Sequence, residues 1–449
     1  MAPPPLHAQA GAPGASLVRR LGPYDAAAIV ISNVIGGGIF FVPIIVAQLV
    51  PNPGWMLAVW LFGGALALAG AMAYAELAAV RPHAGGEYVY LRDAFGPLAA
   101  FLTGWTSFVA GFSGAIAAGT VALADYVLRF FPGAAGARPL IAIAAIAALT
   151  LIHVRGLGPG RVVQNFLAAL KVSAILLIVA AGFAIGDGDA THFTGPSTTT
   201  TVPWLLALVP VMFSYSGWNA AAYVAEEVRD PSRNVPLALG LGTIAVIVIY
   251  LALNALYLFA IPLPELAALG DGRLMDTVAE RLFGFAAGNL IALFTIVSLA
   301  ASISAMILAG PRVYFAMARD GIFMRAAGRV HPRFHTPATA ILAQAVWSSV
   351  LVLSGTLSQL VNYTGFAVVL FSAIAVCALF VLRRRDPHAP RPFSAIGYPW
   401  APAIFVIASA VMVANAFWRE PTTTIAGVAV ILLGIPVYYL FRSGRRTQN

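Results

Sequence analysis

The stretch Asn33-Val34-Ile35-Gly36-Gly37-Gly38-Ile39-Phe40 decides the fold, because it interrupts an apolar run, residues 24–50, that is long enough to cross a bilayer. Each glycine disfavours a helix by roughly 1 kcal/mol relative to alanine, and three in a row leave backbone amides uncovered. In hydrocarbon, such a break survives only where it is packed in protein or lines a polar cavity. The stretch predicts a helix broken at mid-membrane that offers backbone groups to a ligand. A packing face between helices is the alternative.

The composition around this stretch is that of a polytopic membrane protein. The chain has 449 residues, of which 60% are hydrophobic and 10% are charged, and its mean hydropathy is +0.87. Apolar runs of about 20 residues predict an all-α protein with twelve transmembrane helices. We expect these spans at residues 24–50, 55–80, 96–131, 137–154, 162–186, 202–227, 236–260, 286–317, 337–354, 357–382, 399–418 and 421–441.

The arginines predict the orientation of these spans. With the N-terminus inside, twenty of the 25 arginines fall in cytoplasmic segments and five fall in outer ones. This positive-inside asymmetry predicts that both termini are cytoplasmic, with tails at residues 1–20 and 442–449, the first of them disordered. It also explains the net charge of +9 as topology, so no nucleic-acid partner is implied.

A second interruption lies in the sixth span, within Val209-Pro210-Val211-Met212-Phe213-Ser214-Tyr215-Ser216-Gly217-Trp218-Asn219. Proline removes a backbone hydrogen bond, and the serines and glycine weaken the turn that follows. Spans one and six each open a block of five spans, so the second block is inverted relative to the first. We expect a five-plus-five inverted repeat, residues 21–186 and 202–385, followed by two C-terminal helices at 399–441.

The two breaks predict what the site binds. The half-helix after Gly36–Gly38 presents free N–H groups and a positive dipole end, which suits a carboxylate. The half-helix ending near Phe213 presents free carbonyl groups and a negative dipole end, which suits an ammonium. Together they predict a site for a zwitterion such as an α-amino acid.

Lys171 is the chain's only lysine, and it lies about 15 Å from the cytoplasmic end of the fifth span, close to mid-membrane. Arginine stays charged, whereas a buried lysine can lose its proton. Two functional interpretations stay open: proton exchange during transport, or a fixed ammonium that hydrogen-bonds the broken first helix. A snorkelling lysine is the structural alternative. Ser298 and Ser302 in span eight are one turn apart and are candidates to face this lysine, or simply to pack helices.

The motifs together resemble the amino acid–polyamine–organocation superfamily and, within it, the L-type amino acid transporter branch. The resemblance covers most of residues 20–400. The residues that carry it are Ile35–Phe40, Tyr74–Leu77 with Gly85–Tyr90, Phe213–Asn219 followed by Glu226 and Glu227, and Gly310–Gly321.

The resemblance implies secondary active transport of neutral L-amino acids by alternating access, as a proton-coupled symporter or an exchanger. It implies that the substrate carboxylate meets the amides of Gly37 and Gly38, that Phe213 gates the site with Trp218 nearby, and that Lys171 is the coupling residue. The ammonium would meet carbonyls of Val34, Phe213 and Ser216. We expect the substrate-binding set to comprise Val34, Gly36, Gly37, Gly38, Phe213, Ser214, Ser216 and Gly217.

Gly37 departs from the resemblance, because the family often has serine at this position. Carboxylate contact here would therefore rest on the backbone alone. Eukaryotic relatives pair with a heavy subunit through a cysteine near the outer end of span three, and this chain has none there. We therefore expect no disulfide-linked partner, and we expect the bacterial inner (cell) membrane as the location. Protons remain a possible coupling ion.

Other functions are weaker. An intramembrane enzyme would need paired acids, a metal cluster or an activated nucleophile, and the sequence shows none, so we expect no enzyme, no cofactor and no metal ion. A polyamine or cationic amino acid permease would want carboxylates at the breaks. A non-transporting sensor of amino acids is the other alternative, but no soluble signalling domain is evident.

The charged residues near the inner surface have more local expectations. Glu76 is a candidate for a structural ion pair with Arg81 or Arg92. Acidic residues at the end of span six are candidates for an inner gate that pairs them with Arg19 or Arg20, or for a solvated helix end; they are Glu226, Glu227 and Asp230. Arg312 is expected in the cytoplasmic loop after span eight. The outer segment 261–285 is either a short helical lid or a solvated connector.

Overall fold

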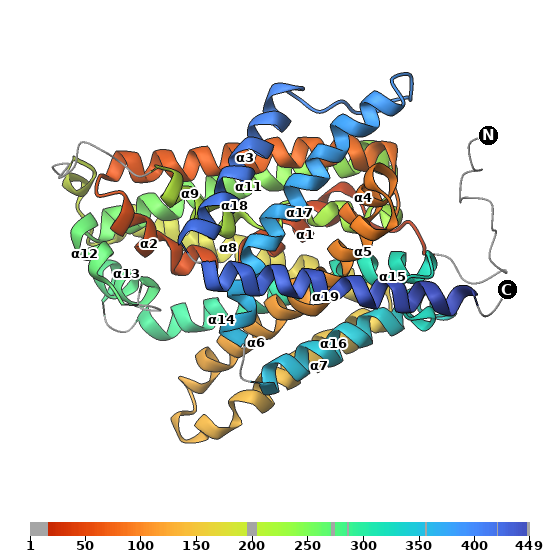
Figure 1. Cartoon of the computed structure of the whole chain (residues 1–449). Coiled ribbons are helices and arrows are strands. Elements are labelled where there is room, and N and C mark those ends of the chain that lie inside the picture. Colours follow the sequence, from red (N-terminus) through yellow and green to blue (C-terminus); the bar gives the residue numbers. More distant parts are fainter. Residues whose placement is uncertain are drawn as a thin grey trace.

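A computed structural model shows a bundle of long helices (Figure 1). It describes residues 17–194, 204–270, 274–284, 287–354, 357–419 and 421–446. Of the tails predicted at 1–20 and 442–449, only residues 17–20 and 442–446 lie in this part of the chain. Within it, Leu17 and Leu21 are buried, and the last helix runs on to Arg446. Over the described ranges the regular structure is helical, and the one exception is a bridge between Leu21 and Val228.

Helices coincide with every expected span. They are α1 (Pro23–Val34) with α2 (Val42–Leu49), α3 (Pro53–Val80), α5 (Pro97–Thr106) with α6 (Phe112–Leu128), α7 (Arg138–Val154), α8 (Leu157–Ile185), α9 (Trp204–Tyr215) with α10 (Ala220–Tyr223), α11 (Pro231–Ala260), α14 (Gly288–Ala309) with α15 (Pro311–Arg319), α16 (Ala338–Ser354), α17 (Leu357–Arg385), α18 (Trp400–Arg419) and α19 (Pro421–Arg446). Within the described ranges, nine helical stretches are long and apolar enough to cross a membrane. The first and sixth spans are not among the nine because each is broken, and α16 is shorter, so the total of twelve stays a prediction.

The shorter elements lie at the two ends of the bundle. One end carries α4 (Glu87–Phe95) and α15, and the other carries α12 (Leu263–Ala268) and α13 (Leu274–Phe283), as Figure 1 shows. The segment 261–285 thus contains two short helices, and Gln48 on α2 donates to the Ala267 carbonyl in the first of them at 2.9 Å.

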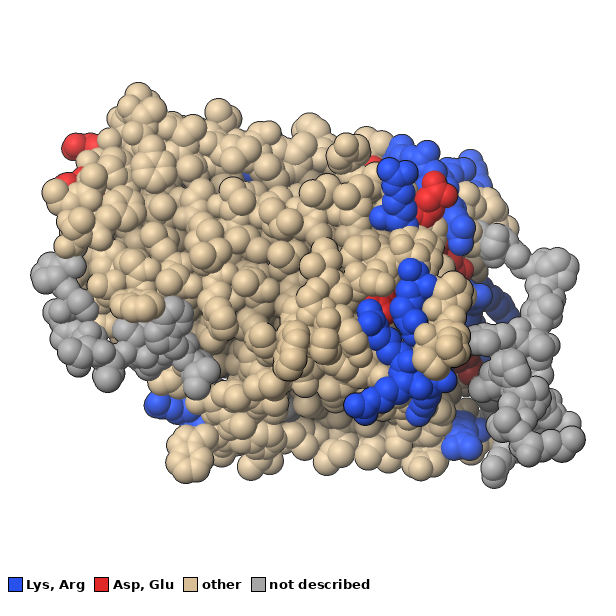
Figure 2. Space-filling view, turned by 90° about the horizontal axis from the view of Figure 1, so that it is seen from above, with Lys and Arg blue, Asp and Glu red and all other residues tan. Residues whose placement is uncertain are grey.

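Basic side chains gather at the end of the bundle where the described chain begins and ends. Figure 2 shows most of the visible lysine and arginine atoms at that end, while the long middle of this face is free of charge. Large apolar side chains cover the middle, among them Leu177 and Leu293, which are 69% and 55% exposed. An uncharged apolar belt capped by a basic end is what a bilayer requires.

Candidate functional site

The first break lies where the sequence places it. Helix α1 ends at Val34, a tight turn closes with the Gly36 amide 2.7 Å from the Val34 carbonyl, and a 3₁₀ turn over Gly38–Phe40 leads into α2. Among the described backbone hydrogen bonds, none is donated by Gly37 or Gly38. Both glycines are partly exposed. Two free amides therefore point away from the helical ladder at this depth, as a carboxylate site requires.

The second break is shifted from its predicted position. Helix α9 continues past Pro210 and Phe213 and ends at Tyr215, so the half-helix is one half-turn longer than expected. The chain then turns at Gly217, whose φ of +103° is a conformation that residues with a side chain rarely adopt. The Phe213 carbonyl accepts the Ser216 amide at 3.0 Å, which leaves this oxygen one further lone pair for a ligand.

The two breaks touch each other. A Cβ atom on Gly38 would lie 2.8 Å from Ser214 Oγ and 3.1 Å from its Cα, and one on Gly217 would lie 3.1 Å from the Asn33 carbonyl carbon. By contrast, a Cβ on Gly37 would meet nothing within 4 Å. Gly38 and Gly217 thus allow the close approach of the two backbones, and Gly37 faces open space.

Tyr250 on α11 is a site residue that sequence reasoning missed. Its hydroxyl lies 2.9 Å from the carbonyl of Val34 and 2.9 Å from the carbonyl of Ser214, so it joins the ends of both half-helices. The only sequence signal was a tyrosine inside the apolar run 236–260, and such a residue is usually a packing residue. Val34 and Ser214, both in the predicted substrate-binding set, thus lie within reach of one hydroxyl.

The two aromatic gate candidates have different surroundings. Phe213 is 42% exposed and its ring centroid is 6.4 Å from that of Phe41, which is 37% exposed. Trp218 is buried, with its ring edge-to-face against Tyr74 at 4.9 Å and Phe405 at 5.6 Å. Phe213 therefore has room to move, whereas Trp218 is fixed in the packing.

Lys171 lies against the first break, as one of the two functional interpretations expects. It is fully buried, and its Nζ donates to the Ser302 hydroxyl at 2.9 Å, to the Ser32 carbonyl at 3.3 Å and to the Ile35 carbonyl. The Ser302 hydroxyl lies 2.8 Å from the same Ile35 carbonyl. The snorkelling alternative is wrong, because a snorkelling lysine keeps its ammonium in water. Of the two serines, Ser302 reaches the lysine.

A partly buried carboxyl group, that of Glu87, lies on the basic side of the second break. Tyr74 donates to Glu87 Oε2 at 2.7 Å, Tyr223 also hydrogen-bonds this carboxyl, and Asn219 donates to the Tyr223 hydroxyl at 3.0 Å. Burial raises the pKa of Glu87 above its usual range, although the two phenol hydrogen bonds act in the opposite direction. A hydrogen-bonded chain thus runs from the sixth-span break to a carboxyl group that begins α4.

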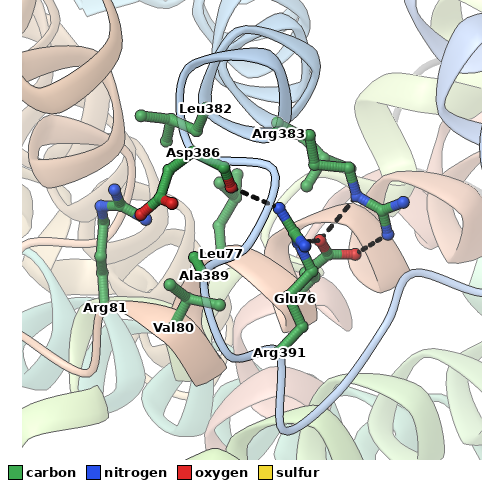
Figure 3. Close-up of a pocket in the computed structure, with 10 residues that line it drawn as sticks. Glu76, Leu77, Val80, Arg81, Leu382, Arg383, Asp386, Ala389 and Arg391 are labelled. Carbon is green, nitrogen blue, oxygen red and sulfur yellow. Dashed lines mark hydrogen bonds and ion pairs between the residues drawn. The ribbon is translucent and has the colours of Figure 1, made fainter.

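The ion pairs at the basic end correct two expectations. Glu76 pairs with Arg383, through both carboxylate oxygens, and with Arg391 at 3.5 Å, as Figure 3 shows; it does not pair with Arg81 or Arg92. Those two arginines bind Asp93 instead. The partners were missed because Glu76 and Arg383 are more than 300 residues apart and meet only through packing of α3 against α17.

The predicted gate between span six and the N-terminal arginines is also wrong in its partners. Glu226 pairs with Arg319 at 2.9 Å, and Glu227 pairs with Arg312 at 2.9 Å. Arg312 lies in α15 and is buried, not in a loop. Arg20 and Leu21 do reach Glu227, but through their backbone amides to its carbonyl, at 2.9 and 3.0 Å.

This arrangement defines a class of protein: a membrane transporter built on two broken helices that face each other. Comparison with known proteins gives the family. A model of the amino acid permease family matches residues 21–441, and the chain belongs to this family. It is an amino acid transporter, not an enzyme.

Relatives support the L-type branch. The chain is 30% identical to the large neutral amino acids transporter small subunit 2 of Mus musculus over 452 aligned positions, which cover 97% of this chain and 83% of that protein. It is 32% identical to the human cystine/glutamate transporter, with 92% and 83% covered. The serine/threonine exchanger SteT of Bacillus subtilis is 29% identical, with 94% and 97% covered. The resemblance found in the motifs is thereby confirmed.

Proposed function

We propose that this protein moves neutral L-amino acids across the membrane by alternating access around the two breaks. The observation that carries the proposal is the pair of free amides at Gly37 and Gly38 beside the carbonyl end of α9, because this arrangement matches both ends of a zwitterion. Apart from Lys171, the residues placed at the breaks above are uncharged. A neutral substrate side chain therefore fits this site better than a polyamine or a cationic amino acid.

Each predicted site residue then has a role. Gly37 and Gly38 present amides to the carboxylate, and Gly36 shapes the turn before them, because its own amide donates to the Val34 carbonyl. Phe213 and Ser216 offer carbonyls to the ammonium, whereas the Val34 carbonyl, which the Gly36 amide and the Tyr250 hydroxyl already contact, fixes the end of α1. Ser214 and Gly217 keep the second break close to the first. Phe213 closes over the substrate, and Trp218 supports the break from the packed side.

We infer that Lys171 acts as a fixed ammonium in this conformation. A protonated amine has three N–H groups, and three acceptors surround Nζ: two carbonyls and the Ser302 hydroxyl. A neutral amine would leave one of them without a donor. The negative end of the α1 dipole adds to the stabilisation, because Ser32 and Ile35 belong to the last turn and the cap of that helix.

We propose that the basic end faces the cytoplasm, in the inner membrane of a bacterium. We also propose that the two repeats span residues 21–186 and 202–385, followed by α18 and α19.

The basic end is closed by ion pairs between segments that are far apart in sequence, such as Arg92–Asp320 and Arg319–Glu226. Phe213 and Phe41 are exposed on the other side of the breaks. This supports a conformation open to the outside. Cys377, the only cysteine of the sequence, belongs to α17 and not to span three, which supports a chain without a disulfide-linked partner.

The test is uptake of radiolabelled neutral amino acids into proteoliposomes, for the wild type and Lys171→Met. Three conditions are compared: no gradient, an inward proton gradient, and amino acid preloaded inside. Uptake that needs internal amino acid and ignores the gradient identifies an exchanger with Lys171 as a fixed cation. Accumulation driven by the gradient and lost in Lys171→Met would make Lys171 the proton carrier instead. Binding without uptake in any condition would leave a sensor and overturn transport.

A further inference from the structure

Four arginines surround one cavity at the basic end of the molecule. The cavity has a volume of about 290 Å³ and is lined by Arg19, Arg20, Gly158, Arg161 and Arg229. We call it the arginine cavity. Its walls come from the chain before α1, the first turn of α8 and the link between Glu227 and α11. Three segments that are far apart in sequence thus bring positive charge to one place.

The positive charge of the arginine cavity is not balanced by the described part of the protein. Arg161 is 3.5 Å from Asp25, but this carboxylate also accepts hydrogen bonds from the Gly22 amide and from Asn165. The guanidinium groups of Arg19, Arg20 and Arg229 have no ion pair or hydrogen bond to any described residue.

The other acidic side chains near this end do not neutralise the arginines of the cavity. Glu226 and Glu227 are engaged by Arg319 and Arg312, and Asp230, next to Arg229 in sequence, does not line the cavity. Arg81, Arg92, Arg312 and Arg319 at the same end each have a carboxylate partner, in contrast to the three arginines of the cavity named above. Repulsion between like charges at this distance favours an anion between them.

The start of α8 adds to the attraction for an anion. Gly158 lies in the first turn of this 29-residue helix, which begins after Gly156 at φ +136°. The first amides of a helix have no carbonyl partner within it, and they carry the positive end of the helix dipole. Guanidinium groups beside free amides are the groups that bind phosphate.

The surface next to the cavity indicates where the phosphate comes from. Along α8, Gly158 is followed at four-residue spacing by Val162, Phe166 and Leu170, which are 61%, 65% and 41% exposed. Residues at this spacing share one face of a helix. An exposed apolar stripe therefore begins at the cavity and runs toward the middle of the membrane.

We propose that the arginine cavity is a binding site for a phosphate ester, supplied by the headgroup of an anionic phospholipid whose acyl chains lie along this stripe of α8. The bound headgroup joins the start of α1 to α8 and to the link before α11, and so stabilises the basic end in its closed form. The site does not depend on the transport mode proposed above. Only the assignment to the cytoplasmic leaflet rests on the proposed orientation.

The test measures binding by the purified full chain in detergent, from the shift of the thermal unfolding midpoint. The probes are dioctanoyl-phosphatidylglycerol, dioctanoyl-phosphatidylcholine and glycerol 3-phosphate. We expect phosphatidylglycerol to raise the midpoint with concentration and phosphatidylcholine to leave it unchanged. In Arg19→Gln/Arg229→Gln the apparent affinity for phosphatidylglycerol falls roughly tenfold or more, since each basic residue near an anionic lipid contributes substantially.

The matched control is Arg384→Gln/Arg442→Gln, which removes two exposed arginines at the same end but outside the cavity. It keeps wild-type affinity. Equal losses in both double variants, or equal binding of phosphatidylcholine, would overturn the site. Glycerol 3-phosphate binding as tightly as phosphatidylglycerol would overturn the lipid source. In Val162→Ser/Phe166→Ser we expect the preference for the lipid over glycerol 3-phosphate to shrink. Because none of these measurements uses transport, the absence of uptake would not affect them.

Discussion

Two fully buried cations of this protein are stabilised in different ways. Arg312 meets a carboxylate: its Nε and Nη2 donate to the two oxygens of Glu227 at 2.9 and 3.0 Å, and Nη1 donates to the Leu308 carbonyl. Lys171 meets no carboxylate in the described part of the chain, and its partners there are two carbonyls of the first break and the Ser302 hydroxyl. The charged partner of the arginine is a side chain, whereas the two carbonyl partners of the lysine are available only because α1 ends there.

This difference indicates which of the two buried cations depends on the conformation of the protein. The Arg312–Glu227 pair survives any movement that keeps α15 and the segment after α10 together. The environment of Lys171 changes when α1 tilts or its last turn rewinds, because the carbonyls of Ser32 and Ile35 would then no longer face the lysine ammonium. We infer that Arg312 serves stability and that Lys171 senses the state of the broken helix. The following predictions test this contrast, from the largest expected effect to the smallest.

Glu227→Gln should cause the largest loss of stability. Arg312 would remain buried and charged, because a guanidinium does not lose its proton, and breaking such a pair costs about 3–5 kcal/mol. The measurement is thermal or denaturant unfolding in detergent. Arg312→Met should cost less, because the stranded Glu227 can take up a proton. The double variant Arg312→Met/Glu227→Met should recover part of the loss. A double variant no better than Glu227→Gln alone would contradict the role of the pair.

Lys171→Met should reduce stability less than Glu227→Gln does, but it should strongly reduce uptake. Removing the cation leaves the Ser32 carbonyl without its donor, while the Ile35 carbonyl keeps the Ser302 hydroxyl, so the expected stability loss is about 1–3 kcal/mol. Uptake should nevertheless fall at least a hundredfold, because the broken end of α1 loses its cation. Ser302→Ala is the control: it removes one acceptor, keeps the charge and should retain most uptake. If Lys171→Met transports normally, the lysine is not coupled to the break.

Gly38→Ala and Gly37→Ala test the break itself. A Cβ on Gly38 would press on the backbone of Ser214, so one of the two breaks must shift, at an expected cost of about 1–3 kcal/mol. A Cβ on Gly37 meets nothing within 4 Å, so stability should stay within about 0.5 kcal/mol. Unfolding and substrate affinity are measured for both. Similar stability losses in the two variants would mean that the breaks do not approach as closely as described.

The sequence predicted the features that have a local cause. Three adjacent glycines break a helix wherever they lie. A single lysine in an apolar run must find hydrogen-bond acceptors. The length of each apolar run predicts where a transmembrane span lies. What it could not predict are contacts between segments that are far apart in the chain. Tyr250 joins two breaks that lie 36 and more than 200 residues away, and Glu76 reaches Arg383 only because α3 packs against α17. The exact end of α9 also depends on packing, since Pro210 is tolerated inside the helix.

Glu87 extends the comparison to an anion, because its partly buried carboxyl group is hydrogen-bonded by two phenols and has no cationic partner in the described part of the chain. Its raised pKa means that the folded state binds this proton more readily than the unfolded chain does. The contribution to stability is therefore fully present below the unfolded pKa of about 4.3 and is lost as the pH rises through the higher folded pKa.

Glu87→Gln, which keeps an acceptor for the phenols and does not titrate, should remove this dependence. We expect the variant to gain stability relative to the wild type as the pH rises above the unfolded pKa, by roughly 1.4 kcal/mol for each unit by which folding raises the pKa. Glu226→Gln serves as the control, since Glu226 has a cationic partner in Arg319 and no such gain is expected. A difference between Glu87→Gln and wild type that stays constant with pH would mean that the carboxyl does not titrate in this range. Glu87 would then be a hydrogen-bond acceptor for Tyr74 and Tyr223 and nothing more.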